Sequence, residues 1–275
     1  MRFHKYHGLG NNFVLVDDRD GSVSKDPRWI VNVCDVNRGI GADGILYVQE
    51  PEEEDNDFKM QIFNSDGTEA EMCGNGIRCF AKYIVDYDLM DSTWLKIETL
   101  AGVIRTSVER GDDGKVKFVT VNMGKPELVG EKFDTIALPD GTEIPITPIS
   151  MGNPHAVIFA KTDLEEVERM GPLIENHERF PNRTNVEFLD VLGEEEADLI
   201  VFERGCGITQ ACGTGTCASV FAGVLHGKFK VGKTVLVHLL GGDLWITVKE
   251  DMSSVIMKGP AVEVYVADLN EEAFK

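Results

Sequence analysis

Cys73-Gly74-Asn75-Gly76 and Cys212-Gly213-Thr214-Gly215 are two copies of one motif within a chain of 275 residues. Each copy follows a phenylalanine by ten positions, Phe63 in the first case and Phe202 in the second. The two cysteines are 139 positions apart (212 minus 73), which is close to half of the chain. A motif that recurs at half the chain length indicates an internal duplication, and this duplication determines the fold that we expect.

Further matches flank the motif in the same order and at nearly the same offset. Gly10–Val16 resembles Gly152–Ile158 at an offset of 142, and Thr99–Val103 resembles Leu239–Asp243 at an offset of 140. Three matches in one order predict two similar domains. The prolines and the Asp-Gly turn within 126–148 suggest a connector between these domains.

Short runs of β-branched and aromatic residues predict several strands in each half. Only one stretch per half suits a long helix, Ile77–Val85 in the first and Cys217–Leu225 in the second. The second stretch is small and apolar on every side, so it must be enclosed. We therefore predict an α/β (α+β) fold in which each domain is a mainly antiparallel β-roll around a central helix. The predicted strands are 13–16, 45–48, 59–63, 95–98, 116–121, 156–159, 186–189, 199–202, 235–239, 244–248 and 255–257.

The composition is strongly acidic, with 47 acidic residues against 27 lysines and arginines and a formal net charge of −20. Such a surface repels the phosphates of nucleic acids and anionic membranes, so neither is an expected partner. The N-terminal segment lacks the apolar core of a signal sequence, and no apolar run is long enough to span a bilayer. These features predict a cytoplasmic protein with reduced cysteines, whose spacings do not suit a metal site.

Each repeated cysteine stands between a predicted strand and the start of the predicted central helix. The first N–H groups of a helix have no partner within the helix, and they favour a thiolate or a carboxylate. If the two domains face each other, Cys73 and Cys212 reach a shared cleft from opposite sides. Inverting a carbon stereocentre requires one group to remove hydrogen from one face while another delivers it to the opposite face. The duplication therefore predicts a racemase or epimerase with two thiols as acid and base.

Motifs along nearly the whole chain resemble those of diaminopimelate epimerases. They are His7–Phe13, Phe63–Gly67, Cys73–Phe80, Met151–His155, Asn185, Glu203–Gly205 and Thr209–Gly215. The resemblance implies two pseudo-symmetric domains, 1–117 with 263–275 and 118–262, with the active site in the cleft between them. It also implies a homodimer that interconverts LL- and meso-2,6-diaminopimelate in lysine biosynthesis, without pyridoxal phosphate, another cofactor or a metal.

The resemblance also implies a role for each matching position. Cys73 and Cys212 would be the catalytic acid–base pair, and His155 and Glu203 would tune their pKa values. The residues implied to bind the substrate are Asn11, Asn64, Gly74, Asn75, Asn153, Asn185, Glu203, Arg204, Gly213 and Thr214.

Two positions depart from the family pattern: Gly44 stands where many relatives have glutamine, and Ile208 where others have an acidic residue. Both departures concern the fine specificity and leave the two thiols untouched. The alternatives are a proline or hydroxyproline racemase of the same superfamily, a non-catalytic amino-acid-binding protein and a thiol-based redox sensor. Arg204 and three asparagines favour a substrate with a second charged end, which proline lacks.

Overall fold

The computed structural model describes residues 1–270, which divide into two compact units. Unit 1 comprises Met1–Val121 and the chain from Gly259 onward, and unit 2 comprises Asn122–Lys258. The predicted domain limits differ from those of the two units by four residues at each junction. The first part of the N-terminal domain was predicted to end at 117 and ends at 121, and the C-terminal domain was predicted to end at 262 and ends at 258. The last part of the predicted first domain, 271–275, falls outside the described residues.

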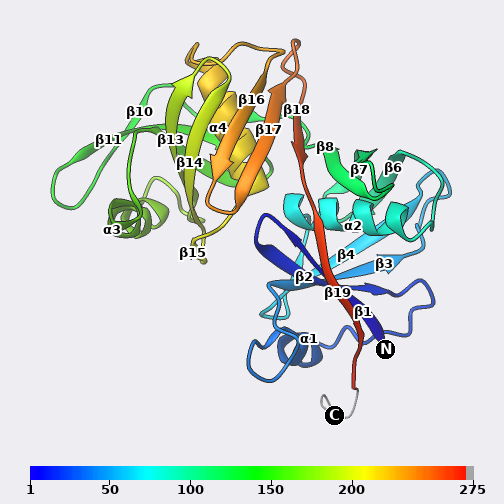
Figure 1. Cartoon of the computed structure of the whole chain (residues 1–275). Helices are drawn as coiled ribbons and strands as arrows, with labels where there is room; N and C mark the ends of the chain where they lie inside the picture. The colour runs from blue at the N-terminus through cyan, green and yellow to red at the C-terminus, as the bar shows by residue number, and fades with distance from the viewer. Residues whose placement is uncertain (271–275) are drawn as a thin grey trace. The chain divides into compact units, whose positions relative to one another are not determined.

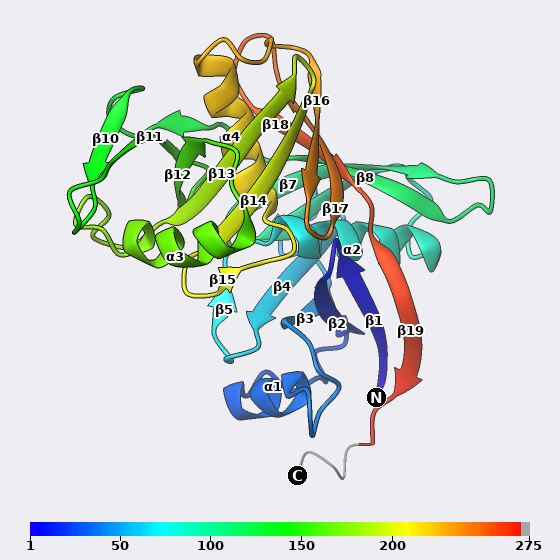
Figure 2. The same cartoon turned by 60° about the vertical axis from the view of Figure 1, so that its left-hand side comes forward.

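Unit 1 is a sheet with one helix on each face, as Figures 1 and 2 show. Helix α2 contacts β1 to β4, whereas α1 packs with Val14, Val16 and Ile45 on the opposite face. Because side chains alternate along a strand, the neighbouring Phe13, Leu15 and Leu46 point toward α2. The elements are β1 (Arg2–Gly8), β2 (Asn11–Asp17), α1 (Pro27–Cys34), β3 (Gly44–Gln49), β4 (Phe58–Asn64), β5 (Glu69–Ala70), α2 (Gly74–Asp86), β6 (Trp94–Thr99), β7 (Gly102–Arg110), β8 (Val116–Asn122) and β19 (Val262–Asp268).

Unit 2 repeats this plan, with α4 on one face of its sheet and α3 on the other. Figure 2 shows α3 and β10 together on the side of the sheet away from α4. The elements are β9 (Glu127–Leu128), β10 (Asp134–Ala137), β11 (Glu143–Ser150), β12 (Pro154–Phe159), α3 (Leu164–Glu175), β13 (Asn185–Gly193), β14 (Glu196–Glu203), β15 (Gly207–Ile208), α4 (Gly213–Leu225), β16 (Thr234–Leu239), β17 (Gly242–Val248) and β18 (Val255–Gly259).

Strand pairing confirms the predicted duplication and fold. Most neighbouring strands are antiparallel, but β2–β3 and β4–β6 in unit 1 and β12–β13 and β14–β16 in unit 2 are parallel pairs at equivalent places. Phe13 pairs with Gly44 in β2–β3, and His155 pairs with Asn185 in β12–β13. Helix α4 is buried over most of its length, as its apolar sequence predicts. Each unit is therefore a β-roll around a central helix.

The prediction of one helix per half was wrong, because α1 and α3 also form. Helix α3 has 12 residues and buries Val167, Met170 and Ile174 at helical spacing. Its N-cap Asp163 accepts a hydrogen bond from the Glu166 N–H at 2.9 Å. Pro172 lies inside the helix and acidic residues dominate its first turn, which masks this apolar stripe in the sequence.

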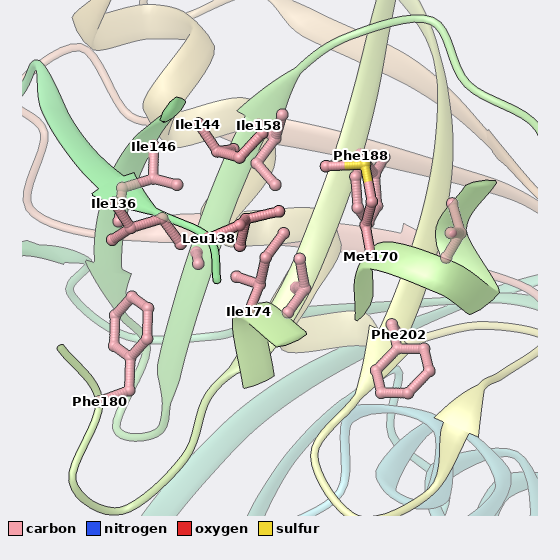
Figure 3. Packing of buried hydrophobic residues seen from close by; sticks show 13 residues of the cluster. Ile136, Leu138, Ile144, Ile146, Ile158, Met170, Ile174, Phe180, Phe188 and Phe202 are labelled. Atoms are coloured by element: carbon pink, nitrogen blue, oxygen red, sulfur yellow. The ribbon is translucent and has the colours of Figure 1, made fainter. Parts of the chain in front are cut away.

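The predicted connector within 126–148 was also wrong. This stretch contains β9, β10 and most of β11, and it belongs to the core of unit 2. Figure 3 shows Ile136, Leu138, Ile144 and Ile146 packed with residues of α3, β12 and β13. Pro126 and Pro139 lie just outside strands, whereas Pro145 and Pro148 lie within β11, opposite Thr135 and Ala156.

Candidate active site

Cys73 and Cys212 are the N-cap residues of the two central helices, α2 and α4. Both have an extended backbone, with φ/ψ of −138°/119° and −121°/110°. Each sulfur accepts a hydrogen bond from the N–H three residues later, Gly76 N and Gly215 N respectively, at 3.4 Å in both cases. The sulfur thus takes the place of the oxygen that usually caps a helix. These N–H donors favour the thiolate form.

Two asparagines surround Cys73 in unit 1. The Asn11 Oδ1 lies 3.7 Å from the Cys73 Sγ and accepts a hydrogen bond from the Asn75 Nδ2 at 3.2 Å. Asn11 begins β2, and Asn75 is the second residue of α2, directly after Gly74. The structure therefore gathers four of the predicted site residues at one helix start.

Arg78 holds this helix start in place. Its side chain is fully buried, and its guanidinium donates to the Gly74 carbonyl at 2.9 Å and to the Asn75 Oδ1 at 3.0 Å. The Nε donates to the carbonyl of Pro260 at 3.1 Å, just before β19. A buried guanidinium needs such acceptors, and here they fix the backbone beside Cys73.

A chain of hydrogen bonds leads to Cys212 in unit 2. The Glu187 Oε1 lies 2.6 Å from the His155 Nδ1, and the His155 Nε2 lies 2.9 Å from the Asn153 Oδ1. The Asn153 Nδ2 donates to the Thr214 Oγ1 at 3.3 Å, and this oxygen lies 3.4 Å from the Cys212 Sγ. Of the predicted residues, Thr214 lies next to the sulfur. Asn153 and His155 are linked to it through Thr214 by successive hydrogen bonds.

The surroundings of Cys212 are buried and acidic. Burial raises the pKa of this thiol well above its ordinary value, and Glu203 and Glu187 raise it further. The Thr214 hydroxyl and the Gly215 N–H oppose this effect. Complete burial also raises the pKa of the Glu187 carboxyl, against the influence of His155. Burial and the two carboxylates therefore favour the thiol form of Cys212 over its thiolate.

The two units differ behind their cysteines. Because Phe13 pairs with Gly44 and His155 with Asn185, the equivalents of His155 and Glu187 in unit 1 are Phe13 and Leu46. The Glu187 side chain has no exposed surface, and its Oε2 has no hydrogen-bond partner among the described residues. The buried His155–Glu187 pair therefore has no counterpart at the equivalent positions of unit 1, which carry apolar side chains.

The remaining predicted residues lie near the ends of β4, β13 and β14. The Asn185 Nδ2 donates to the Pro154 carbonyl at 2.8 Å, and its Oδ1 accepts from the Arg204 backbone N–H at 3.0 Å. The Arg204 side chain is exposed and donates to the Asn182 carbonyl at 3.1 Å. Glu203 accepts from the Thr209 hydroxyl at 2.6 Å. Asn64 is exposed and donates to Thr68 within its own turn at 3.0 Å.

Two residues at the site were missed in the sequence. Glu187 contacts His155, and the Asp43 carboxylate accepts from the Asn11 Nδ2 at 2.9 Å. Each carboxylate is 32 positions from its partner and meets it across a parallel strand pair. The sequence feature that could have indicated them is an acidic residue near the start of a predicted strand, since Asp43 and Glu187 lie within two positions of the starts of β3 and β13.

The two departures from the family pattern have local structural reasons. A Cβ on Gly44 would lie 2.4 Å from the Phe63 carbonyl oxygen, so no side chain fits without moving β4. Ile208 is partly buried and packs against the core cluster of unit 2, where an acidic side chain would lose its hydration.

We expect Gly215→Ala to cost far more activity than Gly76→Ala. A Cβ on Gly215 would lie 2.7 Å from the Glu187 Oε1 and 3.3 Å from the Cys212 Sγ, so it would separate these groups. A Cβ on Gly76 would meet the flexible Leu46 Cδ2 at 3.1 Å and the Cys73 Cβ at 3.4 Å, which small shifts relieve. The check is the turnover of both variants together with their thermal unfolding midpoints. Equal losses would contradict the proposed importance of this packing.

Among residues 1–270, no three His, Cys, Asp or Glu side chains converge as ligands for a metal ion. None of the helices in this range is both long and apolar enough to cross a membrane.

Solved structures of other proteins share this fold. A solved hydroxyproline epimerase from Agrobacterium vitis superimposes with a TM-score of 0.75 at 16% identity, covering 97% of this chain and 91% of that one. A PhzF-family phenazine biosynthesis protein from Bacillus anthracis gives a TM-score of 0.72 at 19% identity, covering 98% of both chains. The fold is thus the two-unit fold that these proteins share.

Proteins with similar sequences identify the family to which this chain belongs. A "Diaminopimelate epimerase" from Bacillus cereus is 42% identical over 273 residues, covering 94% of this chain and 93% of that protein. The profile of the family described as "Diaminopimelate epimerase" matches residues 3–129 and 147–264. The protein is an isomerase. It belongs to the diaminopimelate epimerase family, as the sequence motifs predict.

Proposed function

We propose that this protein interconverts LL- and meso-2,6-diaminopimelate by moving the α-proton between Cys73 and Cys212, without a cofactor. The observation that carries the proposal is the matched position of the two sulfurs, each capping the central helix of its own unit and each accepting an N–H at 3.4 Å. Two bases at equivalent positions suit inversion at carbon, because one can remove the proton from one face while the other protonates the opposite face. Membership of the diaminopimelate epimerase family supports the choice of substrate.

The proton balance of the proposed reaction is simple. One cysteine thiolate removes the α-proton and becomes a thiol, which leaves a carbanion stabilised by the adjacent carboxylate and its hydrogen bonds. The other cysteine donates its thiol proton to the opposite face of the carbon and becomes a thiolate. The N–H groups at the starts of α2 and α4, from Gly74-Asn75 and Gly213-Thr214, are suited to bind the carboxylate as charge develops on it.

The distal end of the substrate carries a second ammonium and a second carboxylate. We assign its recognition to the asparagines Asn11, Asn64, Asn153 and Asn185 and to Glu203 and Arg204. Arg204 supplies the charge that a carboxylate requires, and the Glu203 carboxylate suits the ammonium. The buried His155 and the acidic Glu203 would set the pKa of Cys212, because Glu203 already raises it in the structure.

The direct test uses purified protein, reduced and dialysed against a chelator, with LL-diaminopimelate as the substrate. We expect the meso form to accumulate until the two epimers reach equilibrium, as measured by chiral chromatography. L-Proline and trans-4-hydroxy-L-proline serve as the competing substrates under the same conditions. Turnover of either proline with none of diaminopimelate would overturn the proposal in favour of the racemase alternative.

We also propose that the protein acts in the cytoplasm as a homodimer. The acidic surface and the exposed apolar side chains of β19, Val262, Val264 and Tyr265, support a soluble protein with a self-association surface. Light scattering should give twice the chain mass of 30.4 kDa. A monomer mass at micromolar concentration would contradict the dimer.

A further inference from the structure

Asp43 links the segments of unit 1 that carry the candidate site residues. Its Oδ2 accepts three hydrogen bonds, from the Asn11 Nδ2 at 2.9 Å, from the Asn12 N–H at 2.7 Å and from the Asn12 Nδ2 at 2.9 Å. Its backbone N–H donates to the Asn12 carbonyl at 2.9 Å, and its carbonyl accepts from the Ser65 N–H at 3.0 Å. One residue thus joins the start of β2, the start of β3 and the turn after β4.

This carboxylate determines which end of the Asn11 amide faces Cys73. An amide group has an NH2 donor at one end and an oxygen acceptor at the other. Because the NH2 of Asn11 is directed at Asp43, its oxygen faces the Cys73 Sγ at 3.7 Å and the Asn75 Nδ2 at 3.2 Å. An acceptor beside the sulfur stabilises the thiol, whose S–H can donate, and opposes the thiolate.

The equivalent asparagine of unit 2 has the opposite orientation. Asn153 directs its oxygen at the His155 Nε2 and its NH2 at the Thr214 Oγ1. The Thr214 Oγ1 that accepts this hydrogen bond also lies 3.4 Å from the Cys212 Sγ, where either atom can be the donor. The position equivalent to Asp43 is Thr184, which is buried and donates to the Asn185 carbonyl. In unit 2 the NH2 end of the asparagine, and not its oxygen, is therefore directed toward the cysteine, through Thr214.

We propose that Asp43 is a positioning residue that holds Asn11 with its amide oxygen toward Cys73, so that this sulfur has a side-chain acceptor beside it in addition to the Gly76 N–H donor. The inference deepens the proposed function, because it concerns the protonation of the two groups assigned to proton transfer. It gives Asp43 a role through Asn11 and assigns it no contact with the reacting carbon.

Site-specific alkylation tests the inference without substrate. Wild-type protein and variants are treated briefly with iodoacetamide at pH 7, and peptide mass spectrometry gives the alkylation rate of Cys73 relative to the exposed Cys206. Asp43→Ala releases the Asn11 amide, which can then turn its NH2 to the sulfur and stabilise the reactive thiolate. The relative rate at Cys73 should rise by about fivefold, the effect of one ordinary hydrogen bond. Cys212 in unit 2 should keep its wild-type rate.

The conservative variant Asp43→Asn separates orientation from charge. A single oxygen of Asp43 accepts all three hydrogen bonds, and an amide oxygen can take its place. Asp43→Asn should therefore keep the slow wild-type alkylation of Cys73. An unchanged rate in Asp43→Ala, or an equal rise in Asp43→Asn, would overturn the inference.

A second variant covers the case in which Asp43→Ala does not fold, as judged by its thermal unfolding. Asn11→Ala removes the acceptor itself and should accelerate the alkylation of Cys73 to a similar extent. No acceleration in that variant would also overturn the inference. Epimerase activity of the wild type is measured in parallel. If it were absent while the alkylation pattern held, the proposed function would fail and the role of Asp43 in orienting Asn11 would stand.

Discussion

In deuterium oxide, the early meso product should carry deuterium at the inverted carbon while the recovered LL-diaminopimelate remains almost wholly protiated. With two separate bases, the hydrogen delivered to the product comes from the second thiol, which has exchanged with solvent. A single base that serves both faces would return the original hydrogen to the product or bring deuterium into the recovered substrate. Mass spectrometry of both epimers at low conversion distinguishes these outcomes.

The same mechanism requires that Cys73→Ala and Cys212→Ala each lose epimerase activity by about 10³-fold or more, because neither remaining sulfur reaches the far face of the carbon. Cys79→Ala and Cys217→Ala are matched controls. These cysteines are buried in the same two helices, one to two turns beyond the caps, and should keep near-normal turnover. Robust turnover by either cap variant would exclude the two-thiol mechanism.

Arg204→Ala should lower kcat/KM by about thirtyfold, mainly through KM. A buried, charge-assisted contact to a carboxylate is worth about 2–5 kcal/mol when one partner is removed. Arg204 is exposed in the structure, so we expect the lower end of this range, and about 2 kcal/mol corresponds to about thirtyfold. Arg204→Lys should also be impaired, because a lysine cannot donate two parallel hydrogen bonds.

Arg183 provides the control for Arg204. It lies on the same side of unit 2 and already forms an ion pair with Glu175 at 3.2 Å. Its backbone has a positive φ of 60°, which asparagine tolerates better than alanine, so Arg183→Asn is the suitable change. If Arg183→Asn and Arg204→Ala lost activity equally, the effect would reflect the general charge of the surface. If Arg204→Ala kept normal kcat/KM, the proposed binding of the distal carboxylate by Arg204 would be wrong.

The sequence was sufficient for the features that the duplication repeats. The helix starts at Cys73 and Cys212 follow from the Cys-Gly-x-Gly motif, because glycines and a capping side chain are local signals. The enclosure of α4 follows from its uniformly apolar composition. The repeated order of motifs predicted two similar units, and the structure has them.

Features that depend on pairing between strands distant in the chain could not be predicted from the sequence. Glu187 and His155 meet only because β12 and β13 pair in parallel with His155 beside Asn185. A glutamate in Asn185-Val186-Glu187 otherwise has the pattern of an exposed strand position, although its side chain is fully buried. Helix α3 was not predicted, because Pro172 within it is typical of a helix end. The apolar residues Val167, Met170 and Ile174 nevertheless lie at helical spacing.

The path of the chain through the two units fixes the order in which they can fold during synthesis. Unit 2 is continuous from Asn122 to Lys258, so all of its strands are synthesised before β19. Unit 1 lacks β19 until this strand has been synthesised, which leaves β1 without one neighbour and the Arg78 guanidinium without the Pro260 carbonyl. The unit whose synthesis begins first is therefore completed last, and the start of α2 beside Cys73 gains its contact with the Pro260 carbonyl only after unit 2 has been synthesised.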